Sequence, residues 1–284
     1  QVYLLTRLLL SSTTRIGVEN PCFREAINTF LLADAEVVPH PVDEEGIVLN
    51  ERPCDYYYVT PGHQVPTGVT MSSARRRQLL EHAARHDAVI IEDDYDSESN
   101  FTLNPLPALK ASDRSGRVVY VSSLSKALSP GLRLGFMVAD PDLIDEARAL
   151  RRLVYRHPPT NIQYQMAHFL AQGHYETHLR RYHYDSAQRW ERLHAALQRY
   201  LPSCRALAGS EHANAFWLQT PAQINTQQLT WRAAHAGVLI EPGARHFLSA
   251  APPDNYFRMG FHAINPDAIA QGVEVLRGQL EQMG

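Results

Sequence analysis

The amino-acid sequence predicts an α/β fold, in which helices cover both faces of a mainly parallel sheet, followed by a smaller α+β lobe. Two observations lead to this prediction. Short apolar runs alternate with helical stretches through residues 1–140, which is the rhythm of strand–helix–strand units. A helical region then follows from Pro141 to about Leu201, and short strands and helices close the chain.

The first lobe is expected over residues 1–155, as a large ligand-binding lobe whose N-terminal part is missing from the chain. Residues 2–10 are predicted to form a helix, and a strand at 15–18 leads into a second helix that ends near Leu32. Ser72 is the predicted N-cap of a helix that continues to His86. Further strands are expected at 36–38, 56–59, 88–91, 118–121 and 134–138.

The second part, residues 156–284, is predicted to hold the remainder of a long helical region and a small C-terminal lobe. Its strands are expected at 213–220, 238–240 and 256–261, and its helices at 226–236 and 265–282. The chain begins without Met, at Gln1, and is already in a helical apolar pattern there. We therefore expect a longer protein with residues upstream.

Composition narrows the class of protein. The net charge is −3 and the pI about 6.6, so there is no overall basic surplus to attract nucleic acid. Cys22, Cys54 and Cys204 are widely spaced and lack metal-ligand spacing, which is typical of reduced thiols in a cytoplasmic protein. No apolar run approaches the roughly 20 residues of a membrane helix, and no signal peptide is visible.

One lysine stands out. The sequence has only two lysines against 25 arginines. Lys126 directly follows Ser125 and comes three residues after Ser123, with Arg133 seven residues further on. Two hydroxyls and a guanidinium can hold a phosphate dianion, and a buried lysine amine can form an imine with an aldehyde. This combination indicates pyridoxal 5′-phosphate (PLP). The alternative is a surface lysine in a serine-rich loop, as Lys110 is expected to be.

The acidic turn after the strand at 88–91 supplies two more candidates. Asp93 is expected to keep the pyridine nitrogen of PLP protonated, and Tyr95 to hydrogen-bond the ring oxygen. Asp93 and Lys126 both follow predicted parallel strands, and ligands bind at such carboxyl ends. The alternative is a solvated or calcium-like acidic loop, which is the simpler interpretation for Asp94, Asp96 and Glu98.

Two further motifs have a functional and a structural interpretation. The turn at residues 60–68 brings either His63 or Gln64 to the cofactor, or is purely structural. Arg258 lies in an apolar strand and needs an anion, which is either a substrate carboxylate or an internal carboxylate. Arg75, Arg76 and Arg77 are expected on a solvated helix face. We expect no metal site, because His174, His178 and His183 do not form a clean ligand set.

Together these motifs resemble the MocR/GabR family of bacterial transcription regulators. The resemblance covers nearly the whole chain in order. It is carried by Arg75-Arg76 and by the runs YVTPGHQVPTGVTMS (58–72), EDDYDSE (92–98), SK (125–126), RLG (133–135) and FRMGF (257–261). Such regulators join an N-terminal winged helix-turn-helix domain to a domain with the fold-type I aminotransferase fold, which binds PLP and senses an effector.

The resemblance implies a seven-stranded-type sheet, an imine at Lys126 and ring contacts from Asp93 and Tyr95. It implies an effector carboxylate at Arg258 and phosphate contacts at Ser123, Ser125 and Arg133. It also implies a homodimer, DNA binding through an upstream domain that is absent from this chain, and a small amino compound or B6 vitamer as effector.

The sequence departs from the aminotransferase pattern at Val65, where stand-alone enzymes usually carry an asparagine that donates to the ring oxygen. The regulator, with little or no turnover, is therefore the favoured function. Two alternatives remain. One is a PLP-dependent aminotransferase of the aminoadipate or aromatic type, in which Lys126 also moves protons as a general acid–base. The other is a relic that keeps the fold without the cofactor.

Overall fold

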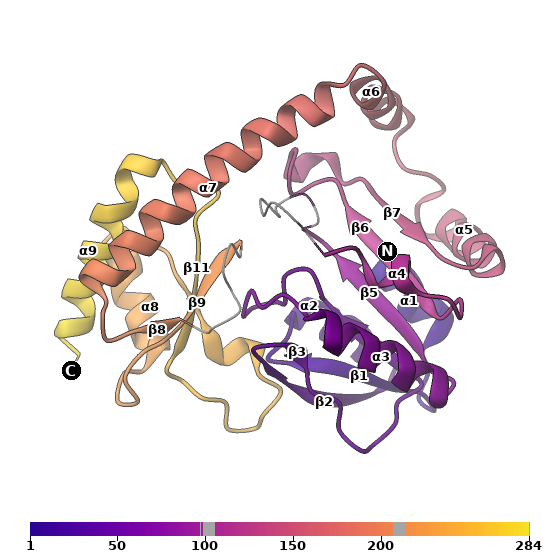
Figure 1. Ribbon diagram of the computed structural model, residues 1–284, viewed down its shortest axis with the longest axis horizontal. Helices are drawn as coiled ribbons and strands as arrows, with labels where there is room; N and C mark the ends of the chain where they lie inside the picture. Colours follow the sequence, from indigo (N-terminus) through magenta and orange to yellow (C-terminus); the bar gives the residue numbers. More distant parts are fainter. Residues whose placement is uncertain (97, 99–105, 207–213, 284) are drawn as a thin grey trace.

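The computed structural model describes residues 1–96, 98, 106–206 and 214–283, arranged around two separate sheets (Figure 1). The larger sheet has seven strands in the order β3-β2-β1-β4-β5-β6-β7. Its strands are β1 (Arg15–Asn20), β2 (Glu36–Asp43), β3 (Gly46–Ile47), β4 (Tyr56–Val59), β5 (Val89–Asp94), β6 (Val118–Ser123) and β7 (Gly135–Val138).

The predicted mainly parallel sheet is confirmed. Strands β2, β1, β4, β5 and β6 are parallel neighbours, and only the edge strands β3 and β7 run antiparallel to theirs. The β6–β7 connection, which carries the predicted lysine loop, is therefore a hairpin-like reversal rather than a crossover. Residues after β5 and β6 lie at the same edge of the sheet, as the sequence suggested.

Helices cover both faces of this sheet, and neighbouring residues of one strand enter different cores. Tyr58 packs with Phe30 under α1 (Val2–Leu9) and α2 (Arg24–Leu31), whereas Tyr57 packs with Leu79 under α3 (Ser73–Arg85). This alternation follows from the two-residue period of a strand. The short helix α4 (Leu109–Ser112) joins the α3 side, and α5 (Pro141–Tyr155) joins the α1 side.

The smaller sheet has the order β10-β11-β9-β8 and is antiparallel. Leu197, Phe257 and Val273 belong to its core. The strand expected at 238–240 lies slightly later, and residue 213 of the expected strand at 213–220 lies outside the described residues. The elements are β8 (Arg205–Ala206), β9 (Ala215–Gln219), α8 (Thr226–His235), β10 (Glu241–Pro242), η3 (Gly243–His246), β11 (Tyr256–Gly260), η4 (Pro266–Ala268) and α9 (Ile269–Glu281).

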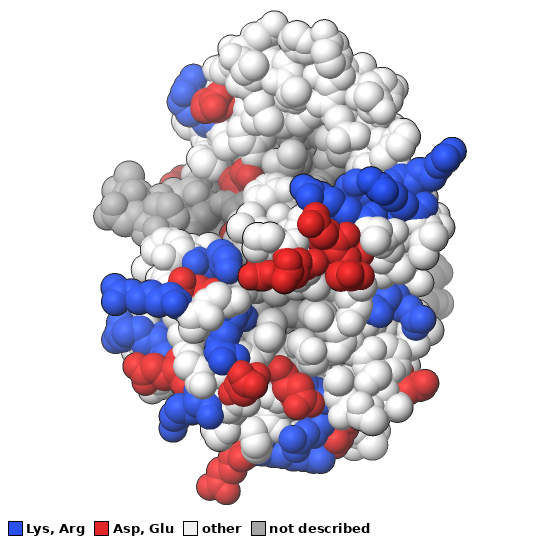
Figure 2. Space-filling model, turned by 90° about the vertical axis from the view of Figure 1, so that its right-hand side faces the viewer, with Lys and Arg blue, Asp and Glu red and all other residues white. Residues whose placement is uncertain are grey.

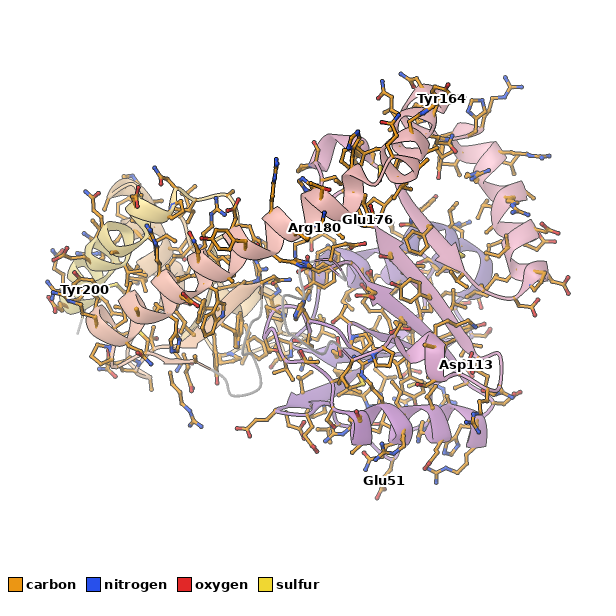
Figure 3. The ribbon with its side chains drawn as sticks, turned by 45° about the horizontal axis from the view of Figure 1, so that its top comes forward. Glu51, Asp113, Tyr164, Glu176, Arg180 and Tyr200 are labelled. Carbon is orange, nitrogen blue, oxygen red and sulfur yellow. The ribbon has the colours of Figure 1, made fainter. Side chains whose placement is uncertain are left out.

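Helix α7 (His174–Tyr200) connects the two sheets. It follows α6 (Thr160–Ala171) and runs past the large sheet to α9 of the small lobe (Figure 1). Figure 3 shows Glu176 and Arg180 near its start and Tyr200 at its far end. One continuous helix of 27 residues thus contacts both parts of the molecule.

The expected solvated face of α3 is wrong for two of its three arginines. Arg76 is buried, with 8% of its surface exposed, and its guanidinium donates to the backbone carbonyls of Met71, Pro107 and Pro61 at 2.9, 2.7 and 2.9 Å. Arg75 donates to the carbonyls of β3 and to Asp43. Sequence periodicity could not reveal these partners, because they lie in loops that only the fold brings to α3.

Replacing Arg76 by methionine is expected to lower the free energy of unfolding by about 2 kcal/mol, because three backbone carbonyls around the buried Arg76 lose a charged donor. Urea denaturation measures this loss. Arg77→Met, one residue along the same helix but on its exposed side, is the control and is expected to change stability by less than about 0.5 kcal/mol. Equal effects from the two substitutions would contradict this role for Arg76.

Two surface properties bear on function. No described helix is long and apolar enough to cross a membrane. On the face seen in Figure 2, which includes the α5 side, acidic and basic side chains lie close to one another. That face therefore offers no broad surface of one charge for nucleic acid.

Candidate functional site

Lys126 lies in the loop after β6, where its amine meets a carboxylate. Its Nζ is 2.8 Å from Asp96 Oδ2 and 4.5 Å from the centre of the Tyr95 ring, and 32% of the side chain remains exposed. Burial lowers the pKa of Lys126, although the neighbouring Asp96 carboxylate opposes this shift. A lysine with a lowered pKa is more easily deprotonated, which is what a nucleophilic amine requires.

Asp96 corrects the interpretation of the acidic loop. The sequence suggested a solvated carboxylate, but only 3% of Asp96 is exposed. It accepts a short hydrogen bond from Asn214 Nδ2, and His63 Nδ1 lies 3.8 Å from the same carboxylate oxygen. Asp96 and Asn214 are thus site residues that the sequence reasoning missed. Their partners are far away in the chain, so no local spacing indicated them.

Asp93 is at the end of β5, beside Val121 of β6 in the sheet register. The Tyr58 hydroxyl donates to its Oδ2 at 2.5 Å. Burial raises the pKa of Asp93 to about 6, and the hydrogen bond from Tyr58 only partly opposes that rise. A cation beside this carboxyl would stabilise its ionised form further.

Tyr95 and His63 also come together at this edge of the sheet. The Tyr95 hydroxyl donates to the His63 carbonyl at 2.9 Å and accepts from Asn214 Nδ2 at 2.9 Å. Burial raises the pKa of the Tyr95 phenol and lowers the pKa of the His63 imidazole. Of the two candidates in the 60–68 turn, His63 is the one beside the Lys126–Asp96 pair.

Gln64 points elsewhere, toward a buried carboxylate. Its Nε2 donates to the Pro21 carbonyl at 2.7 Å and lies 3.4 Å from Glu19 Oε2. Thr60 donates to that same oxygen through its amide at 3.1 Å and its hydroxyl at 2.7 Å, whereas Glu19 Oε1 is buried and has no hydrogen-bond partner among the described residues. Burial raises the pKa of Glu19 to about 7.

Ser123, Ser125 and Arg133 line one cavity of about 620 Å³. The Ser125 amide donates to Ser123 Oγ at 3.2 Å, and Arg133 adopts a left-handed backbone conformation with φ of 48° just after the 3-10 turn η2 (Pro130–Leu132). Within the described parts of the chain, Arg133 forms no ion pair with a carboxylate. The cavity is therefore lined by two hydroxyl side chains and a guanidinium.

Arg258 lies on β11 of the small sheet and faces the same region from the other side. Its Nη1 is 3.5 Å from Glu241 Oε2, and its Nη2 is 3.5 Å from Asn214 Oδ1. The side chain is 23% exposed. The internal ion pair, which the sequence left as an alternative, is therefore present.

Helix α7 contacts the lysine loop directly. His178 Nε2 is 2.7 Å from the carbonyl of Ala127, and His183 Nε2 is 2.6 Å from the carbonyl of Glu98. Among the described residues, no group of three or more potential metal ligands comes together, and these histidines make backbone contacts instead. The third histidine, His174, packs against Phe169.

Comparison with known proteins shows the family to which this chain belongs. The model for aminotransferases of class I and II matches residues 2–276. The chain belongs to this aminotransferase family. The α-aminoadipate aminotransferase LysN of Thermus thermophilus superposes with a TM-score of 0.90 at 26% identity, covering 99% of this chain and 75% of that structure. The predicted fold-type I aminotransferase fold is thereby confirmed.

The chain is also similar to transcription regulators. The HTH-type transcriptional regulator TauR of Rhodobacter capsulatus is 36% identical over 276 residues, or 96% of this chain and 56% of the relative. The probable rhizopine catabolism regulatory protein MocR of Rhizobium meliloti is 34% identical over 278 residues, with the same coverages. The resemblance to MocR-type regulators is confirmed, and the chain spans about half the length of these relatives.

Proposed function

We propose that this chain is the PLP-binding, effector-sensing domain of a bacterial MocR/GabR-type transcription regulator. The observation that carries the proposal is the placement of Lys126, with a lowered pKa, at the same sheet edge as the half-buried Asp93 carboxyl and a cavity with phosphate-type donors. The similarity to TauR and MocR favours a regulator over a free-standing enzyme.

The residues present suit PLP. Arg133, Ser123 and Ser125 offer a dianion a cation and two hydroxyls in one cavity. Asp93 is a half-buried carboxyl with a raised pKa, which a pyridinium N–H would stabilise in its ionised form. The LysN structure, which was solved with a phosphopyridoxyl derivative of leucine, has the same fold. PLP itself, when bound, supplies an aldehyde carbon for amines and an electron-withdrawing ring.

Each residue then has a defined role in the proposed site. Lys126 is the amine that bonds to the cofactor, and Asp96 and His63 surround that amine. Tyr95 lies against the lysine and offers its hydroxyl to the ring oxygen after release from the His63 carbonyl. Arg258 holds the carboxylate of an effector, whose amino group approaches Lys126 from the small lobe.

An effector can reach the DNA-binding domain through contacts between the lobes. Asn214, just before β9, joins Tyr95 and Asp96 of the large lobe to Arg258 of the small lobe. An effector that binds both Lys126 and Arg258 favours one relative position of the lobes, and its differential affinity is the energy available for signalling. We propose that this shift acts within a cytoplasmic homodimer on a helix-turn-helix domain outside this chain.

The decisive experiment is an absorbance spectrum of the full-length protein with PLP, followed by borohydride reduction and mass mapping of the labelled peptide. We expect label on the peptide that contains Lys126 and no multiple turnover when amino acids are supplied with 2-oxoglutarate. Sustained turnover would establish the aminotransferase instead. Absence of any label would leave a relic of the fold and overturn the proposal.

A further inference from the structure

The ion pair at Arg258 bears on the ligand that the proposed site accepts. Arg258 and Glu241 face each other across β11 and β10, because the two residues are direct partners in the sheet register. Glu241 Oε2 is 3.5 Å from Arg258 Nη1, while Glu241 Oε1 is 3.4 Å from both Arg245 Nη1 and His246 Nε2. Its two oxygens thus have different partners.

Glu241 is charged at neutral pH. Its contact with His246 lowers the pKa of its carboxyl, and Arg258 and Arg245 act in the same direction. The side chain is 32% exposed, and that of Arg258 23%, so the pair is open to a ligand without being fully solvated. Any anion that approaches Arg258 therefore meets a guanidinium that already has a carboxylate beside it.

We propose that Glu241 is a tethered competitor that an effector carboxylate must displace from Arg258, and that it thereby sets which ligands bind there. This inference rests on the proposed role of Arg258. The separation of 3.5 Å is longer than a good charge-assisted hydrogen bond of about 2.7–2.9 Å, so a carboxylate that binds Arg258 with both oxygens has the better geometry.

Displacement does not leave Glu241 without partners. Its Oε1 already lies beside Arg245 and His246, so Oε2 can leave Arg258 while the carboxylate stays paired. His246 in turn is hydrogen-bonded through Nδ1 to the Cys22 carbonyl at 2.9 Å, which places it at the contact between the lobes. The displaced state therefore costs little, provided that the ligand supplies a carboxylate in exchange.

This competition selects by ligand charge. A ligand with a neutral group at that end cannot replace Glu241, because Arg258 would exchange an anion for a weaker partner. A carboxylate binds, but its affinity is reduced because only the molecules in which Arg258 is free of Glu241 can bind it. The site is thereby restricted to ligands that present a full carboxylate to Arg258.

The test is calorimetric titration of the full-length, PLP-treated protein with succinate, a dicarboxylate without an amine. Glu241→Gln removes the competing charge and is expected to tighten succinate binding about fivefold, in keeping with a partly exposed ion pair of about 1 kcal/mol. Arg258→Gln is expected to abolish binding. Glu25→Gln is the matched control, since Glu25 pairs with Arg245 at 3.5 Å, whereas the carboxylate that pairs with Arg258 among the described residues is that of Glu241.

Tighter binding after loss of the Glu241 charge is a result that a merely structural role for Glu241 does not produce. Unchanged or weaker affinity in Glu241→Gln, or an equal gain in Glu25→Gln, would overturn the inference. Absence of succinate binding in the wild type and in every variant would also overturn it. The absorbance of each sample before titration reports PLP attachment separately, so a failure of the proposed cofactor site is recognised independently.

Discussion

Replacement of Lys126 by alanine is expected to abolish the covalent attachment of PLP completely. The chain has only one other lysine, Lys110, and its Nζ pairs with Asp113 at 3.2 Å on the helix that precedes β6. No described amine other than that of Lys126 lies beside Asp96 and Tyr95. The measurement is incorporation of label after borohydride reduction, quantified by mass mapping.

The matched control is Lys110→Ala, which is expected to retain full labelling. Because Lys126→Ala also removes a cation next to the buried Asp96, a second variant separates chemistry from folding. Lys126→Arg keeps a positive charge next to Asp96 but cannot form the covalent bond, since the guanidinium remains protonated. Labelling that persists in both Lys126 variants and disappears in Lys110→Ala would show that the lysine is assigned wrongly.

The sequence predicted this lysine because its signal is local. Lys126, Ser123, Ser125 and Arg133 lie within eleven residues after an apolar strand, and Asp93 ends a neighbouring strand of the same kind. Strand ends of a parallel sheet share one edge, so position along the chain was enough to place these groups together. The mainly parallel sheet followed from the same alternation of strands and helices.

Residues whose role depends on distant partners could not be predicted in this way. Asp96 pairs with Lys126. It also accepts a hydrogen bond from Asn214 of the small lobe, which comes 118 residues after Asp96 in the chain. Glu241 meets Arg258 only because β10 and β11 pair in that register. Arg76 cannot be distinguished in sequence from the exposed Arg77, and its burial is decided by the loops around Pro61 and Pro107.

The second large effect is expected from the ionisation of Glu19, and it concerns the stability of the fold rather than ligand binding. Its carboxyl is buried on β1, with 3% of the residue exposed, and burial raises its pKa from the usual value of 4.5 to about 7. Thr60 and Gln64 donate to one oxygen, but the other has no hydrogen-bond partner in the part of the chain that the structure describes. Ionisation of Glu19 in the folded protein is therefore unfavourable.

The sign of the pH dependence follows from these two pKa values. Below pH 4.5 the carboxyl is protonated in both the folded and the unfolded chain, and it does not oppose folding. As the pH rises from 4.5 to about 7, the unfolded chain releases the proton while the folded chain keeps it, so stability is lost. Above pH 7 the loss is complete and amounts to about 3 kcal/mol.

Glu19→Gln keeps the shape and the acceptor for Thr60 but removes the ionisable proton. We expect the variant to match the wild type in urea denaturation near pH 4.5 and to exceed its free energy of unfolding by about 3 kcal/mol at pH 8. Glu36→Gln serves as control, because the Glu36 side chain is 47% exposed and pairs with Arg52. A stability difference between Glu19→Gln and the wild type that stayed constant from pH 4.5 to pH 8 would mean that Glu19 is ionised throughout. Thr60 and Gln64, in the turn that carries His63, would then donate to an ionised Glu19 carboxylate and not to a neutral carboxyl.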